Sequence, residues 1–230
     1  MISIIIPTLN EAESLPELLK SLSGSNVTHE VIVCDGGSSD ETVSIAQEFN
    51  AKVITCAPGR GIQLSAGTSI SNGELILFLH ADTRLRSEAL ERLETLLIEK
   101  PNIVGGNFRV FYDDESPFCR FVELLCRAMR SIGMYYGDSG IFVKRHVYDA
   151  IGGIRPIEIM EDVDFVLRLE KSGKTCCISD IPLTTSTRRF KRRSPLALIT
   201  MWVRMHILFA CGVSTRYLSR IYDSQNTSNS

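Results

Sequence analysis

The chain has 230 residues, 44% of them hydrophobic and 23% charged, which is enough to bury a core and excludes disorder of the whole chain. Its net charge of −2 is unevenly placed: residues 1–180 hold 17 Lys and Arg against 26 Asp and Glu, whereas residues 181–222 hold eight Lys and Arg and no acid. The acidic body, and the lack of an aromatic stacking pattern beside the basic run, argue against a nucleic-acid partner.

Strand and helix patterns alternate through the first half of the chain. Runs of β-branched and apolar residues at 2–6, 30–34, 52–56 and 75–79 predict buried strands. A helical pattern follows each run, and we expect Asn10 to N-cap the first helix and Ser39 the second. Repeated strand–helix units of this length predict an α/β fold, with a central, mostly parallel sheet flanked by helices.

The second half is mixed. Alternating apolar residues predict a strand at 104–112, and a 3.6-residue period predicts a helix at 117–132. A turn at 137–140 leads to a short strand at 141–144, and a further helix opens near residue 160. Strands are expected near 175–178 and 183–186, followed by a basic, apolar helical segment at 191–222 and a disordered tail at 223–230.

Cysteine usage and the apolar stretches indicate a compartment. The seven cysteines are odd in number and form no CxxC pair, which is typical of a reducing compartment and not of a zinc ribbon. No basic n-region precedes the first apolar run, as a signal peptide would require. The apolar stretch at 196–213 contains Arg204 and His206 and is short beside the roughly 20 residues of a bilayer span. We expect a cytoplasmic protein, with a peripheral place at the inner membrane face as an option.

Polar residues follow the predicted strands, at the edge where such sheets bind ligands. Asp82 follows the fourth strand, where one carboxylate and a substrate diphosphate together can hold Mg²⁺ or Mn²⁺. An N-cap for the next helix is an equally good interpretation of Asp82. Asp35 follows the second strand and is either an acceptor for a base or ribose, or a turn residue before two glycines.

Acidic residues also open a predicted helix in the second half. Glu161 and Asp162 lie in its first turn, where the helix dipole keeps a carboxylate ionised and able to act as a base. Acids in a first turn often only stabilise their helix, which is the competing interpretation. Asp138 lies in a loop punctuated by glycine, where functional groups are common.

The basic run at 188–193 has two interpretations. It binds a diphosphate or anionic lipid headgroups, or it is a solvated surface run. The apolar, basic segment that follows favours an anionic membrane surface for residues 188–222, while docking on the domain's own core is the alternative.

Together these motifs resemble the family 2 glycosyltransferases, which have the GT-A fold. The matching segments occur in family order across roughly residues 2–190, at 3–11, 31–42, 59–61, 79–82, 137–140 and 160–164. The ending His80-Ala81-Asp82 of the fourth strand looks most like a small bacterial subgroup known as radical-SAM/selenodomain-associated transferases.

The resemblance implies transfer of a sugar from a nucleotide diphosphate donor, often a UDP-sugar, to an acceptor hydroxyl with inversion at the anomeric carbon. It makes residues 1–112 the nucleotide-sugar-binding half and residues 113–190 the acceptor and catalytic half of one domain. Asp162 matches the catalytic base, with Glu161 beside it, Asp138 is placed near the acceptor, and Asp82 near the metal and diphosphate. The residues expected around the nucleotide are Pro7, Thr8, Asn10, Glu11, Asp35 and Arg60.

The chain departs from the family pattern in two places. His80 replaces the first acid of the DxD motif, and it is either a metal ligand, a donor to the diphosphate or a structural residue. The QxxRW signature is missing, which argues against a processive synthase and leaves Arg188 and Arg189 as candidates to face the phosphates.

Two other functions compete with sugar transfer. A nucleotidyltransferase that makes a nucleotide sugar needs a Gly-rich, basic loop after the first strand, where residues 7–11 are acidic instead. A non-catalytic membrane-surface protein on a degenerate transferase fold is the other alternative, and the replacement at His80 supports it. The sequence specifies neither the sugar nor the acceptor, for which a lipid-linked molecule is one candidate.

Overall fold

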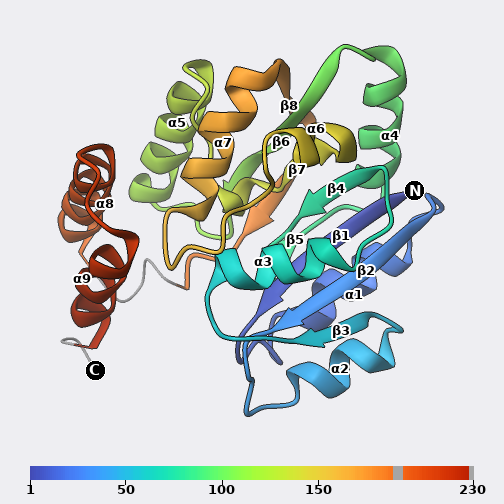
Figure 1. The fold of residues 1–230 in the computed structure, drawn as a ribbon, viewed down its shortest axis with the longest axis horizontal. Coiled ribbons are helices and arrows are strands. Elements are labelled where there is room, and N and C mark those ends of the chain that lie inside the picture. Colours follow the sequence, from blue (N-terminus) through green and yellow to red (C-terminus); the bar gives the residue numbers. More distant parts are fainter. Residues whose placement is uncertain (189–193, 228–230) are drawn as a thin grey trace.

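The computed structural model describes residues 1–188 and 194–227, with side chains described as far as Tyr222 (Figure 1). The described residues form one eight-stranded sheet in the order β3-β2-β1-β4-β7-β6-β8-β5. The first four strands in this order are mutually parallel, and β7 is antiparallel to both of its neighbours, β4 and β6. The strands are β1 (Ile2–Thr8), β2 (His29–Asp35), β3 (Lys52–Thr55), β4 (Leu75–Phe78), β5 (Thr83–Arg84), β6 (Ile103–Tyr112), β7 (Ile141–Lys144) and β8 (Lys174–Thr185).

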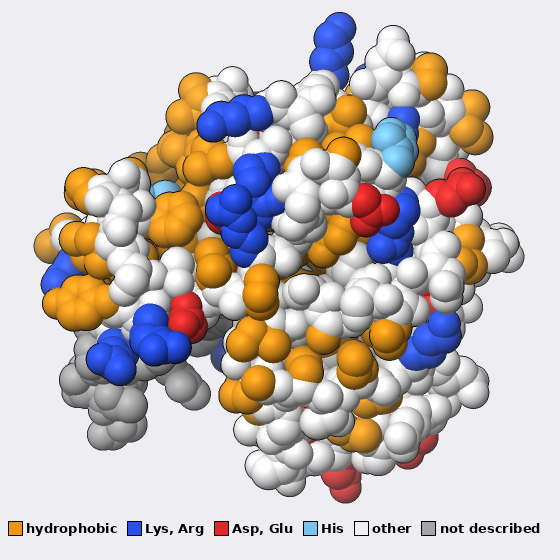
Figure 2. Space-filling view, in the orientation of Figure 1, with side chains coloured by type: hydrophobic (Ala, Val, Ile, Leu, Met, Phe, Trp, Pro, Cys, Tyr) orange, Lys and Arg blue, Asp and Glu red, His pale blue; other side chains and the backbone are white. Residues whose placement is uncertain are grey.

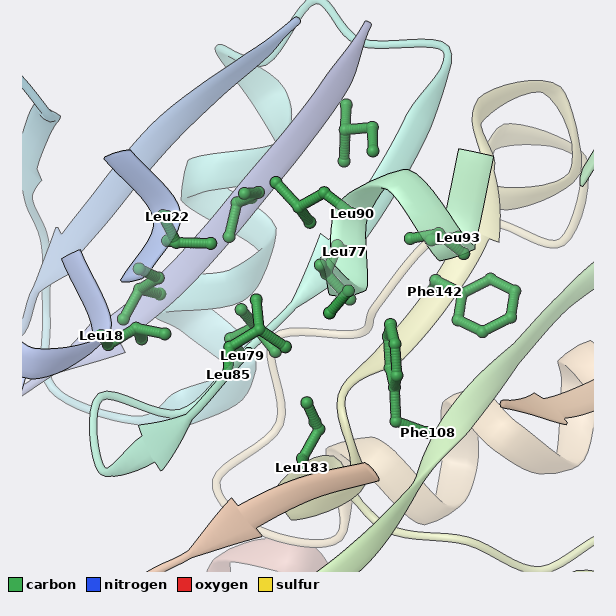
Figure 3. Packing of buried hydrophobic residues seen from close by; sticks show 14 of the residues in the cluster. Leu18, Leu22, Leu77, Leu79, Leu85, Leu90, Leu93, Phe108, Phe142 and Leu183 are labelled. Carbon is green, nitrogen blue, oxygen red and sulfur yellow. The ribbon is translucent and has the colours of Figure 1, made fainter. Parts of the chain in front are cut away.

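Helices cover both faces of the sheet because the strands alternate their side chains between two cores. Ile4 and Ile6 of β1 pack with α1 (Leu15–Ser23), α2 (Thr42–Glu48) and α4 (Ala89–Glu99). Figure 3 shows part of this core, with Leu22 from α1, Leu77 from β4 and Leu90 from α4. Ile5 points the other way and packs with α3 (Arg60–Ser69), α6 (Arg145–Ala150) and α7 (Glu161–Ser172). The predicted α/β fold, a central sheet between helices, is therefore confirmed.

A second group of helices lies beside the sheet. Helix α5 (Pro117–Ser131) covers Tyr112 of β6, and the 3-10 helix η1 (Gly137–Ser139) precedes β7. The basic, apolar segment forms two helices, α8 (Pro195–Ala210) and α9 (Thr215–Thr227). Their inner faces pack on Met160 and Val163, at the start of α7. Docking on the domain, one of the two expected alternatives, therefore describes this face.

Four local details differ from the sequence-based expectation. Asn10 does not cap a helix: α1 begins at Leu15, and Asn10 has a left-handed backbone with φ 54°. Helix α2 begins at Thr42, so Ser39 is not its N-cap. The two strands expected near 175–178 and 183–186 are one strand, β8, whose pairing with β6 shifts register between Phe108 and Val110. Helix α9 continues to Thr227, into the segment expected to be disordered.

Candidate active site

The fold brings the ends of several segments to one edge of the sheet. Strands β1 and β2 end there, and the loop after β4 carries His80 and Asp82. Because β7 runs antiparallel to β4, its preceding turn η1 reaches the same edge with Asp138. Carboxyl ends of parallel strands are where open α/β sheets bind their ligands. The ends of β1, β2 and β4 therefore lie at one edge, as their parallel pairing requires.

Asp35 organises the turn after β2. It is 2% exposed, and its Oδ2 accepts hydrogen bonds from the backbone N–H groups of Gly37 and Ser38, both at 2.9 Å. Its Oδ1 accepts from the Ser38 hydroxyl at 2.5 Å and from the Thr8 hydroxyl at 3.4 Å. Thr8 and Pro7 are themselves buried in β1. These contacts fix the backbone at the ends of β1 and β2.

The loop after β1 is tied to the loop after β2. The Asn10 side-chain oxygen accepts from the Ser39 backbone N–H at 2.8 Å, and the Asn10 backbone N–H donates to the Ser38 hydroxyl at 2.8 Å. Asn is one of the few residues that tolerate the left-handed backbone this contact needs. Asn10, after β1, and Asp35, at the end of β2, therefore fix the two exposed loops at this edge of the sheet.

Gln63 also joins these strand ends, and no sequence motif indicated it. Its Nε2 donates to the carbonyl oxygens of Thr8 and Cys34, both at 2.7 Å. The whole residue is only 4% exposed. A buried amide that satisfies two strand-end carbonyls holds β1 and β2 in fixed relation. The sequence signal that could have indicated it is that Gln63 is a polar residue among the small residues on the buried face of α3.

Arg188 lies between two predicted site acids. Its guanidinium donates to Glu11 Oε2 at 2.8 Å and lies 3.9 Å from Asp82 Oδ2. The hydrogen bond to Glu11, with the nearby charge of Asp82, raises the pKa of Arg188. Arg188 thus brings a positive charge next to Asp82, after β4, whereas Arg189 lies outside the described residues.

The donor set for a metal ion is small. Among residues 1–188 and 194–227, no three His, Cys, Asp or Glu side chains gather into a metal-holding group. Asp82 offers one carboxylate, 8% exposed, at the ligand edge. Mg²⁺ is commonly held by one or two carboxylates together with substrate phosphates, and Asp82 fits that mode.

His80 lies near the turn that contacts Asp162. A Cβ on Gly137 would come within 3.0 Å of His80 Nε2 and 3.5 Å of Asp162 Oδ2. The imidazole and this carboxylate therefore both border Gly137. A side chain at this position would have to displace the imidazole by a few tenths of an ångström.

The adjacent acids Glu161 and Asp162 have different environments. Glu161 is 1% exposed, and its Oε1 lies 2.9 Å from Nε of Arg60, the first residue of α3. This ion pair, helped by the further charges of Asp162 and Asp138, raises the pKa of Arg60. Asp162 is half-buried, and its Oδ2 accepts from the Gly137 backbone N–H at 2.9 Å. Arg60, predicted to lie near the nucleotide, is thus held at the start of α7.

Asp138 lies over a buried tyrosine. The Tyr112 hydroxyl donates to Asp138 Oδ2 at 3.3 Å, and burial together with Asp138 raises the pKa of Tyr112. The thiol of Cys126 is also close, and burial with Asp138 raises its pKa to about 12. Asp138, on the acceptor side of the predicted site, therefore borders the interface between β6 and α5.

Comparisons with known proteins define the family. The model of the family described as Glycosyl transferase family 2 matches residues 3–157, and the chain belongs to this family. A 4,4'-diaponeurosporenoate glycosyltransferase of Staphylococcus haemolyticus is 39% identical over 40% of this chain and 27% of its own length. An undecaprenyl-phosphate 4-deoxy-4-formamido-L-arabinose transferase of Proteus mirabilis is 30% identical over 65% of this chain and 51% of its own length. The chain thus spans at most about half of these two curated relatives.

A solved structure supports the fold. Glucosyl-3-phosphoglycerate synthase of Mycobacterium tuberculosis, in complex with Mn²⁺, UDP and glucosyl-3-phosphoglycerate, superposes with a TM-score of 0.64. The match covers 93% of this chain and 80% of that one, at 20% sequence identity. The described sheet and its helices therefore have the GT-A fold.

Proposed function

We propose that the chain transfers a sugar from a UDP-sugar to an acceptor hydroxyl, with inversion at the anomeric carbon. The observation that carries the proposal is the meeting of Asp35, Asp82 and Asp162, from three separate segments, at the carboxyl edge of the sheet. Family membership and the UDP-bound structural neighbour support the donor class. The His80-Ala81-Asp82 ending is our reason for proposing the radical-SAM-associated subgroup.

On the donor side, the residues around Asp35 form the nucleotide platform. Thr8 ends β1, Asn10 and Glu11 follow it, and the Asp35 carboxylate fixes the backbone between Asp35 and Ser38. A pre-formed platform binds without first paying for the ordering of its loops. Arg188, at the end of β4, places a guanidinium where the diphosphate leaves, and charge-assisted hydrogen bonds to it stabilise the developing negative charge.

Asp82 is the residue that would hold Mg²⁺ or Mn²⁺, with His80 as the second candidate. A divalent ion bound there supplies additional positive charge to the leaving diphosphate. The solved neighbour that contains Mn²⁺ supports this part of the proposal.

Asp162 is the proposed catalytic base. It lies in the first turn of α7, and the Gly137 N–H donates to one of its carboxylate oxygens at 2.9 Å and so orients the group. The proposed chemical step follows from this placement. Asp162 takes the proton of the acceptor hydroxyl, the acceptor oxygen forms a bond to the anomeric carbon, and the sugar–diphosphate bond breaks with its electron pair leaving on UDP. Asp138 would contact the acceptor beside it.

The melting temperature with and without ligand tests donor binding. We expect UDP-sugar with Mn²⁺ to raise it through binding to the folded state, and Asp82→Asn to reduce that rise. Asp149→Asn, at an exposed position on α6, is the control and should keep the full shift. A panel of nucleotide sugars that leaves the wild-type melting temperature unchanged would contradict the proposal.

The acceptor is proposed to be lipid-linked and the chain peripheral, at the cytoplasmic face of an anionic membrane. The named substrate of the Proteus mirabilis relative, undecaprenyl phosphate, supports the lipid class. None of the described helices combines the length and hydropathy of a membrane span. The outer face of α8 nevertheless exposes Leu196, Val203 and Ile207 at 72%, 53% and 57%.

Charge favours a membrane as the partner of this face. Residues 195–222 contain three arginines, Arg204, Arg216 and Arg220, and no acid. Figure 2 shows hydrophobic side chains together with Lys and Arg on the side of the molecule that α8 and α9 form, at the left. An apolar ridge with basic neighbours is typical of helices that lie in the headgroup region of anionic bilayers.

Vesicle co-sedimentation tests the membrane proposal apart from catalysis. We expect wild-type chain to bind vesicles containing phosphatidylglycerol and to release from them as salt rises. The double variant Val203→Ser with Ile207→Ser should bind several-fold less. Ile98→Ser removes another exposed hydrophobic side chain, 76% exposed, from α4 and serves as the control. Equal binding by both variants, or none by wild type, contradicts the proposal.

A further inference from the structure

Arg60 and Glu161 form an ion pair between the first residues of two helices. Arg60 begins α3, which follows β3 on the donor side, and Glu161 begins α7, which presents the proposed base. The Nε of Arg60 lies 2.9 Å from Oε1 of Glu161, and the Glu161 side chain is only 2% exposed. A carboxylate buried to this degree needs polar or charged partners, and breaking a buried ion pair is strongly destabilising, so the pair holds the two helix starts together.

The backbone around the pair is packed just as closely. A Cβ on Gly61 would lie 2.6 Å from the carbonyl oxygen of Ile157 and 2.7 Å from that of Arg155. The segment that leads into α7 therefore rests directly on the first turn of α3. Any change in the place of α3 is passed to the start of α7 through this contact.

The residue before Glu161 adds a further constraint. Met160 has φ 65°, a left-handed conformation that is strained for a residue with a large side chain. Such a conformation persists only where the surroundings impose it. Met160 is packed against α8 and α9 on one side, while the ion pair holds its neighbour on the other. The packing of Met160 and the ion pair of Glu161 together fix the backbone position of Asp162.

We propose that the Arg60–Glu161 pair is a positioning device that sets Asp162 against the donor edge of the sheet. In this role Arg60 acts through Glu161 and not as a nucleotide ligand, and Glu161 is not a second base. The inference rests on the proposed function, because it assigns a role within that reaction. The guanidinium suits the task, since its planar, rigid fork fixes a carboxylate more closely than an ammonium group does.

Displacing a catalytic group by about 1 Å can cost on the order of 100-fold in rate. We therefore expect Arg60→Met and Glu161→Gln each to lower kcat about 100-fold while the UDP-sugar dissociation constant changes less than about 2-fold. The double variant should be no slower than either single variant, because both remove one device. Kinetics of UDP release and calorimetry of donor binding give the two quantities.

Glu170→Gln is the matched control. Glu170 lies on the same helix, and its carboxylate pairs with Arg130 at 3.4 Å, but at the opposite end of α7. This variant should keep kcat within about 3-fold. If Glu161→Gln does not fold, Arg60→Lys and Glu161→Asp keep both charges while altering reach, and intermediate losses in kcat are then expected.

Hydrogen exchange gives a readout that needs no substrate. Amides of residues 158–163 should exchange faster in Arg60→Met and Glu161→Gln than in wild type, and at the wild-type rate in Glu170→Gln. Unchanged exchange overturns the positioning role even if no donor is found. Tenfold weaker donor binding in Arg60→Met would make Arg60 a nucleotide ligand, and additive losses in the double variant would give the two residues separate roles. Wild-type chain that turns over no donor contradicts the proposed function alone.

Discussion

Gln63→Leu removes the amide that joins the ends of β1 and β2. Each of the two hydrogen bonds, both 2.7 Å long, ends on a buried carbonyl oxygen. The Thr8 carbonyl keeps a second donor, the Gly36 N–H at 2.9 Å, and Cys34 stays in the parallel β1–β2 ladder. The loss is therefore that of two hydrogen bonds, at about 1–1.5 kcal/mol each. We expect the free energy of unfolding to fall by about 2–3 kcal/mol.

Urea unfolding followed by circular dichroism measures this loss. A decrease of that size corresponds to a melting temperature lower by roughly 5–10 °C for a chain of this length. Because the nucleotide platform lies on the same strand ends, UDP-sugar should also bind several-fold more weakly. Gln47→Leu, at an exposed position on α2, is the control and should change neither quantity. An unfolding free energy within about 0.5 kcal/mol of wild type would refute the structural role of Gln63.

Three further predictions concern other parts of the molecule. Burial opposes ionisation of Glu30, yet hydrogen bonds from a lysine, a backbone amide and a serine lower its pKa from 4.5 to about 2. Its ionised form therefore stabilises the fold above about pH 4.5, and this stabilisation is lost as pH falls through 2. Glu30→Gln should lower the free energy of unfolding by about 3 kcal/mol at pH 7 and by little at pH 2, as measured by urea titration. Gly61→Ala should lower the unfolding free energy by about 1–3 kcal/mol, because its Cβ meets backbone at 2.6 Å, whereas Gly24→Ala, with 3.5 Å of room, should not. Iodoacetamide at pH 8 should label exposed Cys211 long before Cys126, whose pKa is about 12, and mass spectrometry of native protein that finds the reverse order would contradict the packing of α5.

The parallel half of the sheet was predictable because both faces of its strands are buried. Such strands carry continuous apolar runs, and those at residues 2–6 and 75–79 stand out against their polar neighbours. Strand β8 was predicted as two strands because Pro182 lacks a backbone donor and polar residues precede it. The register shift opposite Arg109 lets the pairing continue past this interruption, and no local pattern reveals such a shift.

The residues of the site were easier to predict than their contacts. The sequence predicted Arg60 near the nucleotide but could not show that it reaches Glu161, because this contact joins segments that only the folded sheet brings together. Gln63 was missed for a similar reason, since its partners are backbone carbonyls and carry no residue-specific signal. Asn10 was mistaken for a helix cap because residues that cap helices also favour left-handed loop positions.

Release of UDP from a UDP-sugar, followed by ³¹P NMR, tests the central proposal most directly. Slow hydrolysis of the donor requires no acceptor, so it can be measured before the acceptor is known. We expect wild-type chain with Mn²⁺ to release UDP from at least one UDP-sugar, and Asp162→Asn to do so about 10²–10⁴-fold more slowly while still binding the donor, as loss of a general base predicts. Equal rates for the two proteins would contradict the assignment of Asp162, and a wild-type chain that releases UDP from no UDP-sugar would contradict the proposed function.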